Sequence, residues 1–117
     1  MKGARIMKKI AIMNCLKANN ACVGAACMDA LNNRTAGFEI YKDEDVELLA
    51  FMRCSGCGKA PDQDSGFQEK LGKIVALNPD ALHVGKCTVK DKKECENITK
   101  AAEILETKGI SVIRGTH

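Results

Sequence analysis

The sequence predicts a single α/β domain with a mainly parallel β-sheet flanked by helices, of the flavodoxin-like or Rossmann-like kind. Short apolar runs typical of buried strands alternate with stretches in which apolar residues recur at helical spacing. The joins between helices and strands are short and carry Asn, Pro or Gly. The chain has 117 residues, enough for one hydrophobic core without disulfides.

The N-terminal half predicts a strand, a helix and two further strands. Residues 8–13 form a short apolar run typical of a buried strand, and from about residue 22 to 33 the apolar residues fall on one helical face. Residues 38–41 have the character of a short second strand. The polar break at 43–45 separates them from residues 46–52, a nearly continuous apolar run typical of a strand covered on both faces.

The C-terminal half predicts two helices, each followed by a strand. Asp64 or Ser65 can cap the first helix, and Gly109 is a natural stop for the second. The expected elements are a helix from about 65 to the turn at 78–80, a strand over 81–84, a polar loop over 88–93, a helix over about 93–108 and a strand over 110–113. The resulting order, β-α-β-β-α-β-α-β, implies right-handed crossovers with helices on the sheet faces.

The composition argues against several classes of partner. The formal charge of +3 is mild and only four residues are aromatic, so we expect no nucleic-acid surface. No apolar run approaches membrane-spanning length, and the N-terminal apolar stretch is too short for a secretion signal. We therefore expect a cytoplasmic protein without a membrane partner. A second start-like sequence at Met7 marks residues 1–7 as an N-terminal extension of one domain over 1–117.

Five of the seven cysteines gather at the predicted carboxyl edge of the sheet. Cys15, Cys54 and Cys87 each close an apolar run. Cys57 follows in a Cys-Ser-Gly-Cys loop, and Cys22 lies in the connection after the first run. Open α/β sheets bind their ligands beyond the carboxyl ends of the strands. The sequence thus concentrates thiols where such a fold builds a site.

A metal centre is the first functional interpretation. The spacing of Cys54 and Cys57 lets both sulfurs bind one metal ion, while a closed tetrahedral site needs four ligands, so other strand ends must supply the rest. Thiolates favour zinc, copper(I) or iron–sulfur. Zinc is the first choice because it needs no assembly machinery, and an iron–sulfur cluster is the alternative. The predicted metal ligands are Cys15, Cys54, Cys57, Cys87, Cys22 and His117.

Thiol–disulfide or sulfur-handling chemistry is the alternative function. Cys54 would be the attacking thiol, and Cys57 or Cys87 the resolving thiol. In dithiol oxidoreductases a helix begins directly at the motif, whereas here polar residues separate Cys57 from the expected helix start at Ser65. A third interpretation is a structural or partner-binding domain whose cysteines only pack. Whether the protein is an enzyme stays open.

The remaining cysteines and the other histidine are less closely tied to the edge. Cys27 lies on the apolar face of the first helix and is assigned to the core, where free cysteine packs as a small hydrophobe. Cys95 divides evenly between core and site, because it shares a face with apolar residues but lies in a first helical turn. His83 lies inside a strand and is interpreted as a core group.

With the cysteines placed, the chain resembles the CGGC-domain family from about Lys8 to His117. The matching segments are a strand ending at Cys15, Cys22-Val23-Gly24-Ala25-Ala26-Cys27, Gly37-Phe38, Cys54-Ser55-Gly56-Cys57-Gly58, a strand ending at Cys87, Cys95 and Gly115-Thr116-His117. The resemblance implies a small, metal-binding prokaryotic protein and says little about a reaction. The site role of His117 rests mainly on it, with Gly115 permitting the tail to turn back.

The chain departs from the pattern of that family at four places. Ser55 replaces the second residue of the name motif, and Gly58 and Val23 stand where proline is frequent. The segment after Cys95 lacks the histidine that many members carry. A metal site that needs this histidine would be incomplete here.

Overall fold

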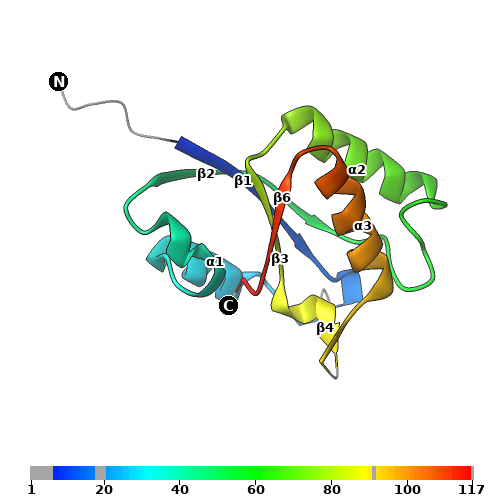
Figure 1. Cartoon of the computed structure of the whole chain (residues 1–117). Helices are drawn as coiled ribbons and strands as arrows, with labels where there is room; N and C mark the ends of the chain where they lie inside the picture. The colour runs from blue at the N-terminus through cyan, green and yellow to red at the C-terminus, as the bar shows by residue number, and fades with distance from the viewer. Residues whose placement is uncertain (1–6, 18–20, 91, 117) are drawn as a thin grey trace.

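The computed structural model describes residues 7–17, 21–90 and 92–116, and it shows helices on both faces of a central sheet (Figure 1). Four parallel strands pair in the order β2-β1-β3-β6. Their bounds are β1 (Met7–Asn14), β2 (Asp45–Arg53), β3 (Ala81–Val84) and β6 (Ser111–Arg114). The α/β prediction is confirmed, and this order matches the first four positions of the flavodoxin-like sheet.

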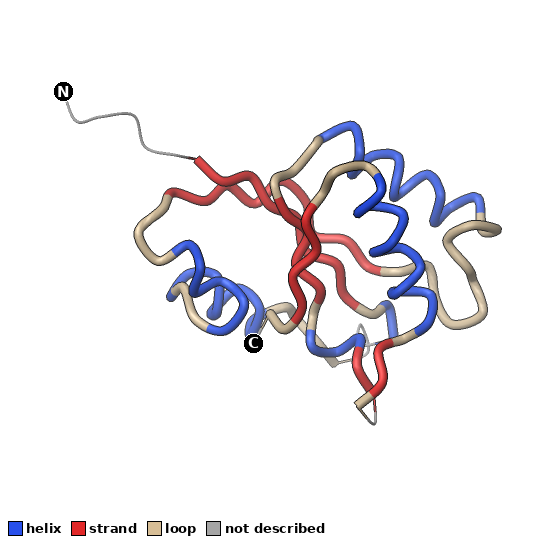
Figure 2. The backbone as a smooth tube through the Cα atoms, in the orientation of Figure 1, coloured by secondary structure: helices blue, strands red, loops and turns tan. Residues whose placement is uncertain are grey.

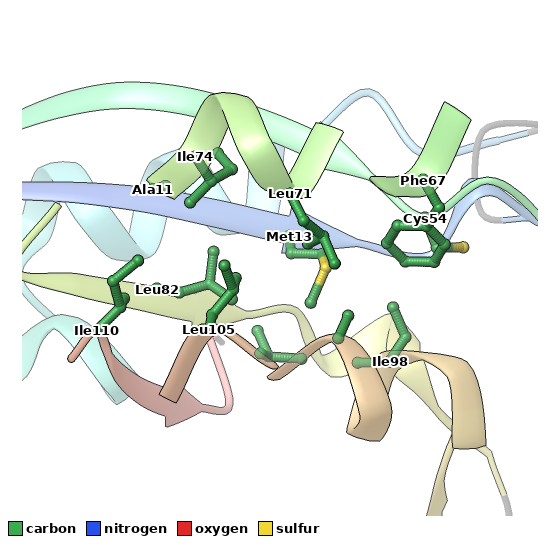
Figure 3. Close-up of a cluster of buried hydrophobic side chains, with 12 residues drawn as sticks. Ala11, Met13, Cys54, Phe67, Leu71, Ile74, Leu82, Ile98, Leu105 and Ile110 are labelled. Carbon is green, nitrogen blue, oxygen red and sulfur yellow. The ribbon is translucent and has the colours of Figure 1, made fainter. Parts of the chain in front are cut away.

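The helices divide into two layers (Figure 2). On one face lie α1 (Ala25–Asn33) and the 3₁₀ helix η2 (Ala36–Tyr41), and on the other α2 (Ser65–Leu77) and α3 (Glu96–Thr107). Each layer closes its own buried cluster. The cluster under α2 and α3, shown in Figure 3, contains Ala11, Met13, Cys54, Phe67, Leu71, Ile74, Leu82, Val84, Ile98, Ala101, Leu105 and Ile110.

Strand β1 is the spine of the sheet, because it pairs with β2 on one side and β3 on the other. Ile10 and Ile12 join the cluster under α1, while Ala11 and Met13 join the cluster under α2 and α3. Successive side chains of a strand point to opposite faces, so a strand between two helical layers must be apolar at every position. This explains the continuous apolar run in the sequence.

The ends of the helices follow the expected capping chemistry. The Asp64 carboxylate accepts a 2.8 Å hydrogen bond from the backbone N–H of Phe67 and so caps α2. Asn78 ends the same helix in the left-handed conformation. After α3, Gly109 has a φ of 87°, which glycine adopts without strain.

Three elements predicted from the sequence differ in the structure. Residues 38–41 belong to η2 and not to a strand, and the three-residue period of η2 turns Phe38 and Tyr41 together into the core. Helix α1 begins at Ala25, because Gly24 before it has a φ of 79°. The loop expected after β3 contains the 3₁₀ helix η3 (Lys86–Thr88) and an antiparallel hairpin of β4 (Val89–Lys90) and β5 (Lys93–Glu94).

Within the described ranges, we find no helix with both the length and the apolar character needed to cross a membrane.

Candidate functional site

A cavity of about 450 Å³ opens beyond the carboxyl ends of the strands. Its lining combines four thiols with two lysines and a threonine: Cys15, Lys17, Cys57, Cys87, Thr88, Lys93 and Cys95. Three of the six ligands predicted from the sequence, Cys15, Cys57 and Cys87, therefore face one space. Parallel strands bring their carboxyl ends to one edge, which is why residues far apart in the sequence meet here.

The end of β1 is tied to three cysteines by three consecutive residues. The Asn14 side-chain amide lies 3.8 Å from Cys27 Sγ, as a weak donor. The next two backbone N–H groups donate to the sulfurs of Cys87, at 3.4 Å, and Cys54, at 3.2 Å. Hydrogen bonds from N–H groups favour the thiolate over the thiol. The chain leaving β1 thus orients sulfur atoms from separate elements.

Cys54 is placed differently from the other cysteines of the predicted cluster. Its side chain is only 3% exposed and packs in the buried cluster beside Phe67 (Figure 3). Its backbone N–H donates to the carbonyl of Asn14 at 3.0 Å, which continues the pairing of β2 with β1. Cys54 is not among the residues that line the cavity. It reaches the site through its hydrogen bond from the Leu16 N–H.

Cys57 is the exposed thiol of the site. Gly56 and Gly58, on either side of it, have φ values of 112° and 82°, in the region that glycine adopts without strain. The loop therefore turns sharply at both sides of Cys57. Its start is anchored, because Lys70 Nζ donates to the carbonyl of Arg53 at 2.9 Å.

Cys22 and Cys27 belong to the segment that leads into α1. Cys22 is partly buried, and its sulfur accepts a hydrogen bond from the Gly24 N–H at 3.3 Å. Cys27 is buried, as the sequence interpretation expected, and its sulfur lies 3.1 Å from Thr116 Oγ1. The Asn14 amide and the Thr116 hydroxyl therefore give the Cys27 sulfur more polar surroundings than a cysteine in a purely apolar core would have.

The C-terminal tail runs to the same edge. Gly115 has a φ of 83° and pairs with two elements, donating to the Val84 carbonyl at 3.1 Å and accepting from the Gly37 N–H at 3.0 Å. Thr116 is fully buried. His117, the last predicted ligand, lies outside the described residues. The tail is thus ordered into the edge up to Thr116.

The thiols around Cys87 act on its ionisation. Burial raises the pKa of Cys87, and the hydrogen bond from the Cys15 N–H partly opposes this. The neighbouring thiols of Cys15, Cys27 and Cys22 raise it further, because like charges near each other disfavour ionisation. Cys87 thus has three other thiols near it, and an incoming cation would favour its deprotonation.

The donors suit a soft metal in their chemistry, since thiolates select zinc, copper(I) and iron–sulfur. In the described part of the chain, however, no group of three or more His, Cys, Asp or Glu side chains is arranged to hold a metal ion. A zinc site needs every sulfur within ~2.3 Å of one point. The four thiols line a cavity wider than such a site.

Four of the lining residues are not among the ligands predicted from the sequence: Lys17, Thr88, Lys93 and Cys95. Cys95 was divided between core and site, and the structure places it at the N-cap of α3, where its N–H donates to the Thr88 carbonyl at 2.8 Å. Lys17 and Lys93 also line the cavity. The position of Cys95 in a first helical turn was the available indication. Nothing in the sequence distinguishes these two lysines from the other lysines.

Comparisons with known proteins match nearly the whole chain. The family model described as the CGGC domain matches residues 9–117. An uncharacterized protein of Methanocaldococcus jannaschii is 34% identical over 119 residues, which cover 93% of this chain and 86% of the relative. No solved structure matches the chain.

Proposed function

The chain belongs to the CGGC-domain family, and on that premise we propose that it binds a soft metal ion at its thiol-lined cavity. The observation that carries the proposal is the gathering of four thiols, from Cys15, Cys57, Cys87 and Cys95, on one cavity at the carboxyl edge. Zinc is our first choice and an iron–sulfur cluster the alternative, because both are bound by thiolates.

The four cavity thiols are the proposed ligands. We propose Cys22, Cys54 and His117 as alternative ligands that could replace one of them. The thiols do not surround one point in the described arrangement, so metal binding requires at least one of them to move. Cys57 is the best suited, because it is exposed and lies between two glycines. The metal would supply a positive charge that holds the thiols as thiolates.

Metal content of the full-length protein purified without oxygen tests this proposal, together with its visible absorption spectrum. We expect zinc, or the absorption of an iron–sulfur cluster, in stoichiometric amount. Cys57→Ser should weaken metal affinity by more than about tenfold, because it removes a ligand. Cys27→Ser is the matched control, since Cys27 does not line the cavity. A folded protein that neither carries nor takes up metal would exclude the proposal.

Thiol–disulfide exchange through Cys54 and Cys57 has weaker support as a second function. The attacking thiol in that scheme, Cys54, is 3% exposed and packed beside Phe67. No disulfide joins the cysteines of the described residues, which suits the reducing cytoplasm that we propose as the location. A redox titration of the thiols separates the two functions, because only exchange requires a disulfide between these two residues.

A further inference from the structure

The cavity has room for more than a metal ion. Its volume of about 450 Å³ falls within the range of roughly 300–1,000 Å³ that is typical of small-molecule sites. A closed zinc site leaves almost no space between its sulfurs, which lie ~2.3 Å from the metal. The cavity is therefore large enough to hold a small molecule.

The charge of the cavity indicates the sign of that ligand. Lys17 and Lys93 both line it, and among the described residues neither has an ion-pair partner. Glu94 follows Lys93 directly in the sequence, but its carboxylate is bound elsewhere. It accepts hydrogen bonds from Arg114 at 2.7 Å and from Thr99 at 2.6 Å. Among the described residues, the two lysines thus place positive charge without an ion-pair partner beside the thiols, and this charge attracts anions.

An accessible nucleophile lies in the same space. Cys57 is the exposed cysteine of the cavity, whereas Cys15, Cys87 and Cys95 are partly buried. Gly58 beside it borders open space, since an added Cβ there would meet no atom within 4 Å. Thiol–disulfide exchange requires access to the attacking sulfur, and Cys57 meets this requirement best.

We propose that the cavity binds a small anionic disulfide, the oxidised form of a low-molecular-weight thiol that carries carboxylates. Lys17 and Lys93 pair with the carboxylates, and Cys57 exchanges with the sulfur. The Cys57 thiolate attacks one sulfur of the disulfide, a Cys57–sulfur bond forms, and the original sulfur–sulfur bond breaks. The second thiolate leaves and takes up the proton that Cys57 released. Cys57 is oxidised and the leaving half is reduced, so the small disulfide is the only oxidant required.

Competition between disulfides of opposite charge tests the proposal. The full-length reduced protein, as purified and after chelator treatment, is incubated with glutathione disulfide, which is anionic, or cystamine, which is cationic. Peptide mass spectrometry measures the rate of mixed-disulfide formation at Cys57. Lys17→Glu combined with Lys93→Glu should lower the ratio of the glutathione rate to the cystamine rate at least about tenfold, because the local charge is reversed.

The matched control is Lys42→Glu combined with Lys108→Glu. Both lysines are exposed and precede strands, at the edge of the sheet opposite the cavity, and the change in net charge is the same. The intrinsic reactivity of each disulfide cancels in the comparison. We expect the control pair to change the ratio less than about twofold, and added salt to reduce the preference for glutathione disulfide.

Equal shifts for the two lysine pairs, or first modification at a cysteine other than Cys57, would overturn the proposal. Circular dichroism of each variant shows that the fold is kept. The proposal does not depend on the metal: a protein without metal that keeps the lysine-dependent preference would remove the proposed function and leave this inference standing.

Discussion

His83 lies inside β3 with none of its surface exposed, and its ring packs against two aromatic side chains. Its Nε2 is 2.7 Å from the Tyr41 hydroxyl, and its ring centroid is 4.4 Å from that of Phe38. Burial lowers the pKa of His83 to about 4. Burial, and then the charges of Asp80 and Glu44, raise the pKa of Tyr41 to about 12. Both side chains are therefore neutral at physiological pH.

Stability should depend on pH through His83. The unfolded chain binds a proton at this residue near its ordinary pKa of about 6.5, whereas the folded protein binds it only near pH 4. The contribution of neutral His83 is complete above pH 6.5 and is lost as the pH falls, by roughly 3 kcal/mol at pH 4. Urea unfolding between pH 4 and 8 measures the loss, and His83→Gln should flatten this part of the profile.

A nuclear magnetic resonance titration gives an independent measure of the same pKa. The chain has two histidines, so His117→Ala leaves the His83 ring as the only imidazole. Its resonance should stay constant from pH 8 down to about pH 5. A midpoint near 6.5 would show that the ring is hydrated and that the buried position is not held in solution.

The C-terminal tail acts as a structural element although it has no regular secondary structure. Gly115 joins β3 to η2 by two backbone hydrogen bonds, and Thr116 fills a buried position against Cys27. Final residues of a chain are usually frayed. Here the last described residue before the end is fully buried, so the tail covers a cysteine of α1.

Truncation of the tail should expose Cys27. Deleting residues 116 and 117 removes the hydroxyl beside Cys27 Sγ and opens a space in the core, which should cost about 1–3 kcal/mol of unfolding free energy. Ellman's reagent should then modify Cys27 in the native state. Deleting residue 117 alone is the control and should keep Cys27 protected. Equal protection in both truncations would mean that another part of the chain covers this sulfur.

The whole molecule is organised around a central pair of strands, with β2 and β6 at the edges. The Cys54 N–H points to β1, because it donates to the Asn14 carbonyl. Successive amides of a strand point to opposite sides, so those of Phe51 and Arg53 point to the open edge. An edge strand, which has a neighbour on one side only, should therefore show two kinds of amide along its length.

Hydrogen exchange should alternate along the end of β2. We expect the amides of Met52 and Cys54 to exchange at least about 100-fold more slowly than those of Phe51 and Arg53. The central strand β1 should be protected at every position from Ile10 to Met13, which are fully buried and lie between two neighbours. Uniform protection of residues 51–54 would indicate that a further strand pairs with the edge.

The sequence predicted the sheet better than it predicted the site. The strand over 81–84 and the α2 cap at Asp64 follow from local pattern and chemistry, and the structure has both. The strand predicted over residues 38–41 is wrong, because a short apolar segment does not distinguish a strand from a 3₁₀ turn that buries Phe38 and Tyr41. Cys54 is buried and Cys57 is exposed. The sequence does not predict this difference, because the spacing of the two cysteines does not show which side of the loop faces the core.

The end of β1 has a consequence for how chains of this kind can vary in length. Asn14, Cys15 and Leu16 each reach the sulfur of a different cysteine, and these cysteines come from α1, η3 and the loop after β2. Inserting or removing one residue before Asn14 would reverse the faces of β1 and break all three contacts together. Gain or loss of residues is therefore tolerated only outside both β1 and this triplet, because the fixed spacing of the triplet keeps three separate elements aligned on one edge.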